Sequence, residues 1–192
     1  VSKSGPLRNY RKHAHTIEAA QKAVAGHRKL EIVYRAYGRR QSDRHVVHPY
    51  CLAFVEQSLY LIAHSELRQA MRHFLVDRIE KATQLREPFA MPEDFDPDEY
   101  LARSFGIYRE DRTFDVRIEF AARIADWVKE REWHPTQKLE ARPDGGLVMA
   151  MTVDGLEDVM RWVLAFGGAA RVLAPPELVE RTRKELEAGA AR

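Results

Sequence analysis

PYCLAFVEQSLYLIAHSELRQAMRHFLVDRI, residues Pro49–Ile79, is the stretch that decides how the first half of this chain folds. It holds two strand-like runs, Cys51–Val55 and Leu59–His64, separated by three polar residues. A third run, Arg72–Ile79, follows after a polar segment. Strand-length apolar runs joined by short polar links predict antiparallel hairpins, so we expect a small sheet here.

The third run predicts a basic face on this sheet. If the strand continues unbroken, Arg72 and Arg78 have the same parity and stand on one face with an aromatic residue between them. Residues 35–78 contain seven arginines, no lysine and four acids. Arginine makes bidentate phosphate contacts and stacks on bases, so such a face suits a phosphate or nucleotide ligand. The alternative is a solvated face in which Asp77 or Glu80 holds Arg78.

A known family matches these residues. The proline-led strand at Pro49, the tripeptide Leu59-Tyr60-Leu61 and the run Arg72–Ile79, which reads RHFLVDRI, resemble the WYL domain of bacterial transcriptional regulators. Leucine stands here in place of the tryptophan that gives the motif its first letter. Leu59 keeps an apolar group but lacks the indole N–H and its stacking area. The longer RHFLVDRI run makes the resemblance more specific than the tripeptide does.

The resemblance implies a ligand site. It predicts a basic pocket on the barrel, built around the motif tyrosine and nearby arginines, that senses a nucleic-acid or nucleotide ligand. Carried over by position, Tyr60 becomes the stacking or hydrogen-bonding residue, and Arg72 and Arg78 become the phosphate ligands. Arg44 and His48, on the strand that leads to the proline, are further members of this predicted site. Short single-stranded DNA is the favoured ligand, and no cofactor or metal is expected.

The residues before the quoted stretch predict a helix and the start of the sheet. Thr16–His27 has an apolar stripe at helical spacing, with Thr16 as its expected N-cap. Leu30–Tyr37 is strand-like, and Arg44–Val47 leads into the proline after a polar turn. A helix followed by five short strands suits a curled sheet or open barrel. The WYL resemblance implies a leading helix and an Sm/SH3-like small β-barrel.

The second half of the chain has its own pattern. Phe114–Phe120 alternates apolar and polar residues, which predicts a half-buried strand. Pro143–Gly146 predicts the turn of a hairpin between Trp133–Ala141 and Leu147–Val153. Helices are predicted at residues 121–132, 156–166 and 176–188, and a short strand at residues 170–173. The order βαββαβ with a final helix is ferredoxin-like.

This half also resembles part of the same family. Trp133, the Asp-Gly hairpin and the runs Trp162–Gly167 and Val172–Pro175 look like the C-terminal extension that follows WYL domains. The two matches imply an α+β chain: an Sm/SH3-like barrel with a leading helix, then a ferredoxin-like βαββαβ domain. The predicted parts are a basic flexible end of a linker (1–15), the WYL barrel (16–86), an acidic proline-containing connector (87–112) and the extension (113–192). The tryptophans of this half are expected in its core, with an oligomer surface as the alternative.

Composition excludes several classes of protein. The chain is 45% apolar and 31% charged, with a formal net charge of +2, which is ordinary for a globular protein. The single cysteine, Cys51, permits no internal disulfide and no cysteine-rich metal site, which fits a reducing cytoplasm. The sequence has no membrane-length apolar run and no motif of a phosphate loop, nucleophile elbow or zinc protease. We therefore expect a cytoplasmic protein that is not an enzyme.

The resemblance also predicts a role. WYL regulators carry a helix-turn-helix domain before the barrel, and residues 1–29 are too few to form one. We therefore expect the ligand-sensing and dimerising part of a bacterial transcriptional regulator, a homodimer that reaches promoter DNA through a domain outside this chain. One alternative is a structural or assembly module that binds no ligand. Another is a phosphate-processing enzyme, which would need acids clustered beside the arginines.

Overall fold

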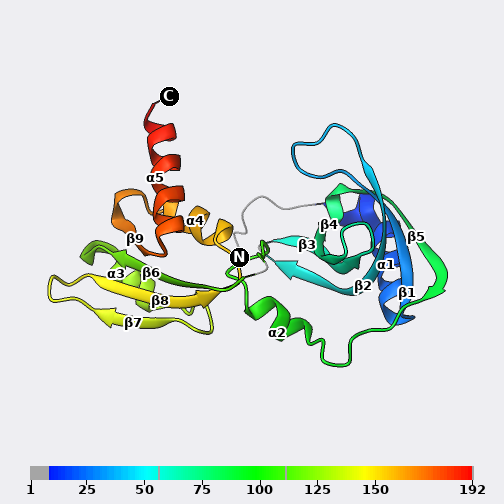
Figure 1. Ribbon diagram of the computed structural model, residues 1–192, viewed down its shortest axis with the longest axis horizontal. Helices are drawn as coiled ribbons and strands as arrows, with labels where there is room; N and C mark the ends of the chain where they lie inside the picture. Colours follow the sequence, from blue (N-terminus) through cyan, green and yellow to red (C-terminus); the bar gives the residue numbers. More distant parts are fainter. Residues whose placement is uncertain (1–8, 56, 111, 192) are drawn as a thin grey trace. The chain divides into compact units, whose positions relative to one another are not determined.

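Two compact units make up the chain in a computed structural model that describes residues 9–55, 57–110 and 112–191. The first unit ends at Pro97 and the second begins at Asp98 (Figure 1). The predicted flexible end, residues 1–15, lies outside the described residues as far as residue 8. Both units mix helices with an antiparallel sheet, so the expected α+β class is confirmed at that level. None of the described helices is long and apolar enough to cross a membrane.

The first unit is a five-stranded antiparallel sheet with one α-helix. Its elements are η1 (Tyr10–His13), α1 (Ala14–Ala25), β1 (Arg28–Tyr34), β2 (Asp43–Val55), β3 (Ser58–Ser65), β4 (Ala70–Leu75), η2 (Val76–Arg78) and β5 (Ile79–Pro88). The strand order is β4-β3-β2-β1-β5, which leaves β4 and β5 as the two edges. The register of β2 against β3 shifts between Pro49 and Cys51, where an extra residue bends the long strand.

Small residues let α1 approach this sheet closely. Ala20 and Ala23 are fully buried and pack with Leu30, Leu61 and Phe74 in one apolar cluster. Without long side chains between them, helix backbone and sheet come near enough to exclude water from these residues. The helix therefore covers one face of the sheet, where it contacts β1, β2 and β5.

The expected N-cap of this helix is wrong. The helix begins at Ala14, two residues before Thr16, and its N-cap residue is His13. A 3-10 turn, η1, precedes it, and the side chain of Asn9 accepts a hydrogen bond from the backbone N–H of Arg11 at 3.1 Å. Because η1 satisfies the first donors, the helical segment starts earlier than the apolar stripe indicates.

The third predicted strand run is also divided. β4 ends at Leu75, and the chain turns through η2 before β5 starts at Ile79. The turn is needed because β4 and β5 lie at opposite edges of the sheet, and Ile79 pairs with Tyr34 on β1. Arg78 therefore stands in a 3-10 turn, where the alternation of a strand no longer decides its direction.

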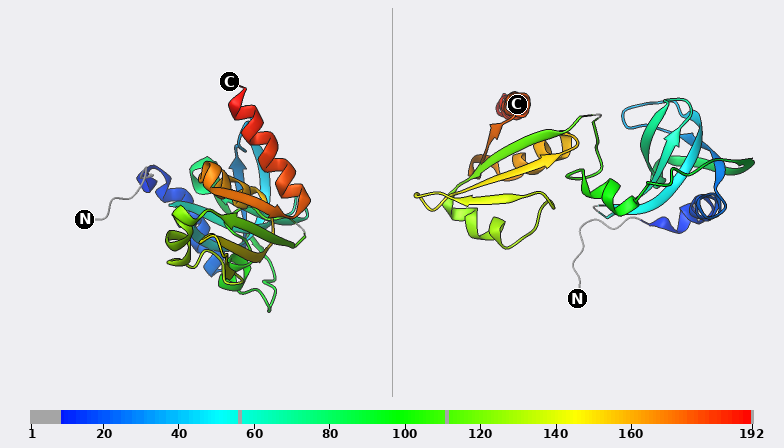
Figure 2. Two further views of the ribbon diagram at one scale, coloured as in Figure 1. Left: turned by 90° about the vertical axis from the view of Figure 1, so that its left-hand side faces the viewer. Right: turned by 60° about the horizontal axis from the view of Figure 1, so that its bottom comes forward.

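The second unit carries a four-stranded antiparallel sheet in the order β7-β8-β6-β9. Its elements are α2 (Pro97–Ala102), β6 (Phe114–Phe120), α3 (Ala122–Lys129), β7 (Lys138–Ala141), β8 (Leu147–Val153), α4 (Glu157–Leu164), η3 (Gly167–Ala169), β9 (Ala170–Ala174) and α5 (Pro176–Ala190). The predicted alternation of Phe114–Phe120 is confirmed, since its four apolar residues are all buried. Figure 2 shows α5 as a rod that extends beyond the sheet, and residues 183–190 on it are exposed.

The hairpin of this sheet is shorter than predicted on one side. β7 begins only at Lys138, because residues 133–137 form a loop with its own hydrogen bonds. The side chain of Gln137 accepts from the backbone N–H of Trp133 at 2.7 Å, and the indole N–H of Trp133 donates to the carbonyl of Val128 at 2.9 Å. These bonds replace a strand ladder over the first five residues of the predicted run.

Aromatic side chains fill the core of the second unit. Trp162 lies at the centre, with ring centroids 4.8 Å from Trp133, 5.2 Å from Phe166 and 5.6 Å from Phe120. Edge-to-face and tilted rings at these distances attract one another beyond simple area burial. Trp133 and Trp162 are partly buried and pack against the core, whereas Trp127 is 43% exposed.

Buried Asp154 anchors the segment that precedes β6. Its carboxylate accepts from the guanidinium of Arg109 at 2.6 Å and from the hydroxyl of Thr113 at 2.9 Å, and Arg103 lies 3.3 Å away. The Asp154 side chain is only 7% exposed, so charged donors must compensate the lost hydration of the carboxylate. The segment that includes α2 is therefore held on the second unit.

Two buried histidines make stability depend on pH. Burial lowers the pKa of His45 in the first unit and of His134 in the second, below the ordinary value of 6.5. The unfolded chain takes up these protons near pH 6.5 while the folded chain does not, so protonation favours unfolding. We expect the free energy of unfolding to be constant above pH 6.5 with respect to these groups, and to fall as the pH drops below it.

Urea melts at closely spaced pH values test this expectation. The window from about pH 5 to 6.5 separates histidines from carboxylates, which titrate lower. His134→Gln should flatten part of the slope, whereas His15→Gln, at an exposed position of α1, should leave it unchanged. A flat profile across this window would contradict the expected role of burial.

Candidate functional site

A basic cavity lies in the first unit, where the loop between β1 and β2 meets η1 and η2. It has a volume of about 560 Å³. Its lining residues are Lys12, Arg35, Ala36, Tyr37, Gly38, Arg39, Leu75, Asp77 and Arg78. Four of these are cationic and one is acidic, so the cavity favours an anion.

Backbone hydrogen bonds fix the segments that carry these cations. The N–H of Arg35 donates to the carbonyl of Arg78 at 3.1 Å, which ties the start of the loop to η2. The N–H of Arg39 donates to the carbonyl of Ala36 at 3.1 Å and closes a four-residue turn. Gly38, the third residue of that turn, has a φ of +73°, a conformation that favours glycine. Three arginines are thereby held around one space.

Few acids neutralise this charge. Arg35 lies 3.5 Å from a carboxylate oxygen of Glu80 at an exposed position. Within the described parts of the chain, no carboxylate comes within ion-pair distance of Lys12, Arg39 or Arg78. Positive charges without carboxylate partners raise the local potential and attract anions more strongly than paired ones do.

The acidic lining residue faces a histidine. A carboxylate oxygen of Asp77 lies 3.7 Å from Nε2 of His13, and both side chains are mostly buried. The contact becomes an ion pair when His13 is protonated. It joins η1, which carries Lys12, to η2, which carries Arg78, so the two turns form one wall of the cavity.

Of the predicted site residues, Arg78 lines the cavity, whereas Tyr60 and Arg72 do not. The resemblance predicts Tyr60, Arg72 and Arg78 as one site, but the strand register does not bring Tyr60 and Arg72 to one face. Arg72 pairs with Ala63 across the β3–β4 ladder, whereas Tyr60 pairs with Leu75. Directly opposed residues share a face, and Ala63 and Tyr60 are of opposite parity on β3. Tyr60 and Arg72 therefore point to opposite sides of the sheet.

Arg44 and His48 are used elsewhere in the fold. Arg44 is exposed and lies 3.2 Å from a carboxylate oxygen of Glu31 on the neighbouring strand. Nε2 of His48 lies 2.9 Å from the carboxylate of Glu66, and its ring stacks on Phe89 at 5.2 Å. Neither residue lines the basic cavity.

The sequence interpretation missed the loop side of the cavity. The sequence pattern predicts only the end of a strand and a polar turn between Arg35 and Arg39. Its signal is the chemistry of that turn, since two arginines and a tyrosine surround Gly38 where Asn, Asp or Ser are more usual. Lys12 was missed because it lies on a short 3-10 turn that apolar periodicity does not reveal.

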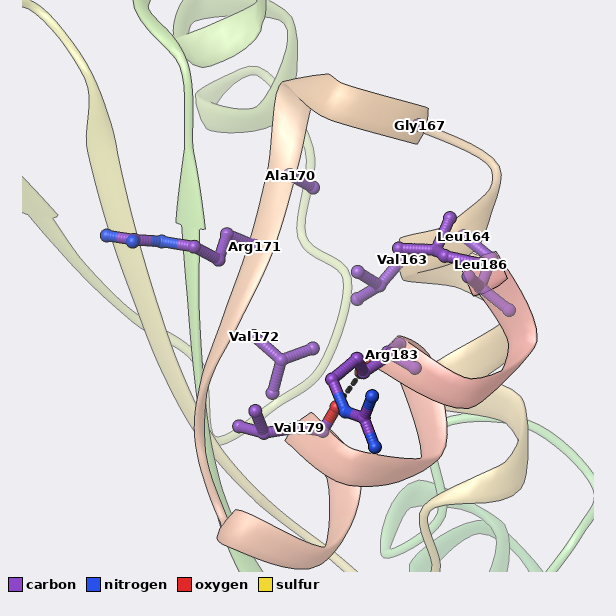
Figure 3. A pocket seen from close by; sticks show the side chains of 10 residues that line it. Val163, Leu164, Gly167, Ala170, Arg171, Val172, Val179, Arg183 and Leu186 are labelled. Atoms are coloured by element: carbon purple, nitrogen blue, oxygen red, sulfur yellow. Dashed lines mark hydrogen bonds between the residues drawn. The ribbon is translucent and has the colours of Figure 1, made fainter. Parts of the chain in front are cut away.

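A second cavity, in the second unit, has different chemistry. It has a volume of about 230 Å³ between α4, β9 and α5. Figure 3 shows Val163, Val172, Val179 and Leu186 around it, while Arg171 points away. The lining is mostly apolar, and the guanidinium of Arg183 beside it is paired with Glu180 and Glu187, so the cavity suits hydrocarbon groups better than a phosphate. Among all residues that the structure describes, no group of three or more His, Cys, Asp or Glu is placed to hold a metal ion.

Two family models match the chain. A WYL domain matches residues 15–84, and a WCX domain matches residues 112–190. Protein PafC of Mycobacterium tuberculosis (strain ATCC 25618 / H37Rv) is 32% identical over 168 residues, which cover 86% of this chain and 51% of that protein. Protein PafC of Mycobacterium leprae (strain TN) is 30% identical over 170 residues, which cover 88% of this chain and 51% of that protein. The chain spans about half the length of these curated relatives.

One solved structure is similar in fold, and a second aligns less closely. A crystal structure of a CRISPR Cas-related protein aligns with 93% of this chain and 52% of its own, at 15% identity and a TM-score of 0.61. Proteasome accessory factor B/C (PafBC) of Arthrobacter aurescens aligns with 96% of this chain and 28% of its own, at 19% identity and a TM-score of 0.43. The two domain matches agree with the resemblances seen in the sequence. The chain therefore contains a WYL domain followed by a WCX domain.

Proposed function

We propose that this chain is the ligand-sensing part of a transcriptional regulator, and that its basic cavity takes an anionic nucleic-acid ligand, either short single-stranded DNA or a nucleotide. One observation carries the proposal. Lys12, Arg39 and Arg78 converge on a cavity of about 560 Å³ and have no carboxylate partner among the residues described. A phosphate there would make charge-assisted hydrogen bonds to these ammonium and guanidinium groups, and backbone hydrogen bonds fix the turn that carries Arg39 and tie the loop to η2.

A single strand suits this site better than a duplex. The cationic groups lie on a loop and two short turns around one open cavity of about 560 Å³, and none of these elements forms a long groove in the residues described. A flexible strand can bring one phosphate into such a space, whereas the regular spacing of duplex phosphates fits extended surfaces. Ligand binding would then favour one arrangement of the regulator and bias promoter binding by a helix-turn-helix domain that is not among these residues.

The finer description of the fold belongs to the same proposal. The order β4-β3-β2-β1-β5, with α1 ahead of it, is the reason to class the first unit as Sm/SH3-like, although β4 and β5 remain edges. The element order β6-α3-β7-β8-α4-β9 and the strand order β7-β8-β6-β9 are the reason to class the second unit as ferredoxin-like.

Titration of fluorescently labelled short oligonucleotides and nucleotides against the chain tests the proposal. Phosphate contacts release counterions, so the logarithm of the affinity should fall linearly with the logarithm of salt concentration, by about 0.7 per phosphate contact for a single strand. Absence of binding to every phosphate ligand at low salt would favour a structural module. Hydrolysis of the ligands, measured in the same samples, tests the enzyme alternative. Metal-dependent cleavage by the unmodified chain that disappears in Asp77→Asn would support an enzyme.

We also propose that the chain forms a homodimer through its second unit. Val179 and Leu186 on α5 are 37% and 54% exposed and line the same apolar cavity, and exposed apolar side chains near one another favour association. Light scattering at a protein concentration on the order of tens of micromolar should give the mass of a dimer. Leu186→Glu should lower that mass, whereas Leu67→Glu, at a position of similar exposure in the first unit, should not. A monomer mass for the unmodified chain would count against the dimer.

A further inference from the structure

Tyr37 is exposed to an unusual degree at the edge of the basic cavity. Its side chain is 86% exposed, the largest value among the large apolar and aromatic residues described as exposed. The guanidinium of Arg78 lies over its ring, with the central carbon 4.8 Å from the ring centroid. At this exposure the opposite face of the ring is open to solvent. One aromatic face is thus held by a cation, and the other is available.

The backbone explains why this ring stands out from the fold. Tyr37 is the second residue of the turn that the Arg39 N–H to Ala36 carbonyl bond closes. Gly38 beside it has open space around the position of a Cβ, with nothing within 4 Å. The turn therefore presents Tyr37 outward, and the ring adds little to the apolar core. Packing gives no reason for an aromatic residue at this position.

Ligand chemistry does give a reason. Each nucleobase has a π face that can stack on an aromatic ring, and a guanidinium over the same system adds cation–π attraction. Lys12 and Arg39 line the same cavity and remain available for the phosphate. A nucleotide could thus stack its base on the open face of Tyr37 while its phosphate lies beside Lys12 and Arg39 in the same cavity.

We propose that Tyr37, backed by Arg78, is the base-stacking residue of this site, so that the cavity selects ligands that carry a nucleobase on a phosphate over phosphates without a base. This inference rests on the proposed function and makes it more specific. Stacking accepts any base, so little sequence preference follows. A mononucleotide and a nucleotide within a single strand offer the same base and phosphate. The experiment distinguishes these two sources by titrating both.

The test compares Tyr37→Ala and Tyr37→Phe with the unmodified chain. Three ligands are titrated: a short oligonucleotide that contains 2-aminopurine, a 2-aminopurine mononucleotide, and inorganic tripolyphosphate. Stacking of one base is worth about 1–3 kcal/mol, so Tyr37→Ala should weaken base-containing ligands by about 5- to 150-fold. Binding of tripolyphosphate should not change. Tyr37→Phe should bind as the unmodified chain does, because it keeps the ring.

The fluorescence of 2-aminopurine provides a second measurement, which would not change if Tyr37 had only a structural role. Stacking on Tyr37 should quench 2-aminopurine in the unmodified chain and in Tyr37→Phe, but not in Tyr37→Ala. Tyr108→Ala, at a 48% exposed tyrosine of the second unit, is the matched control and should change neither affinity nor quenching. Equal loss for both base-containing ligands identifies a single nucleotide as sufficient, and loss for the oligonucleotide alone identifies a strand.

The outcomes separate this inference from the proposed function. If Tyr37→Ala binds and quenches the oligonucleotide as the unmodified chain does, the stacking role is wrong while the phosphate cavity stands. If tripolyphosphate and oligonucleotide both lose affinity equally in Tyr37→Ala, the residue supports the cavity instead of reading a base. If the unmodified chain binds no phosphate ligand, the proposed function fails, and the stacking role fails with it.

Discussion

Arg78→Ala is expected to weaken binding of a short single-stranded oligonucleotide by about 10- to 150-fold at low salt, since a hydrogen bond to a charged group contributes about 1.5–3 kcal/mol. The guanidinium of Arg78 lines the basic cavity and has no carboxylate partner among the described residues, so it is available for a phosphate. It also lies over the ring of Tyr37. Fluorescence anisotropy measures the loss, and the dependence on salt should become shallower by about one phosphate contact.

Arg72→Ala is the matched control for this prediction. It removes the same charge from an exposed position on β4 that does not line the cavity. Arg72→Ala should therefore change affinity only through long-range attraction, which salt screens. Arg78→Lys should recover part of the loss, because lysine keeps the charge without the planar fork. Equal weakening by both alanine variants would indicate diffuse attraction to the surface instead of a site in the cavity.

Phe120→Ala is expected to lower the free energy of unfolding of the second unit by about 3–5 kcal/mol. Phe120 is fully buried on β6, with ring centroids 5.6 Å from Trp162 and 5.5 Å from Phe166. Removing the ring leaves a cavity that these neighbours cannot fill without leaving their own contacts. A loss of this size is a large fraction of the stability of a single domain.

Tryptophan fluorescence in urea measures this loss, because all three tryptophans of the chain lie in the second unit. Phe54→Ala, at a 65% exposed phenylalanine in the first unit, is the control and should leave the tryptophan transition unchanged. A loss below about 1 kcal/mol in Phe120→Ala would mean that the aromatic core repacks around the deletion.

Elements with a regular pattern could be predicted from the sequence. β6 and β8 occupy the predicted residues, and α5 begins at the predicted proline. The period-two alternation of apolar residues in a strand, and the proline at the start of a helix, are local features of the sequence. They predict the element and its buried face without knowledge of distant residues. The predicted strand that corresponds to β7 starts five residues too early. The hydrogen bond that holds Trp133 in a loop reaches Val128 on α3, so it depends on how α3 packs.

The candidate site was predictable only in part, for a related reason. Arginine enrichment pointed to the unit that holds the basic cavity and to Arg78, which lines it. Parity within one strand, however, cannot say which residue of the next strand lies opposite. The register of β3 against β4 places Tyr60 and Arg72 on opposite faces, and a shift of one residue would have reversed this. Tyr37 and Arg39 entered the site through a loop, whose course depends on tertiary contacts.

The buried carboxylate of Asp154 determines where this chain can be joined to another protein in a domain chimaera. The WCX match begins at residue 112, yet the donors that Asp154 accepts include Arg103 and Arg109, which come before that point. A chimaera joined at residue 112 would keep the Thr113 hydroxyl but lose both arginines that compensate the charge of this buried carboxylate. A join ahead of Asp98 would transfer the carboxylate and its donors together. The structural unit that such a chimaera must keep together is therefore longer than the matched WCX domain.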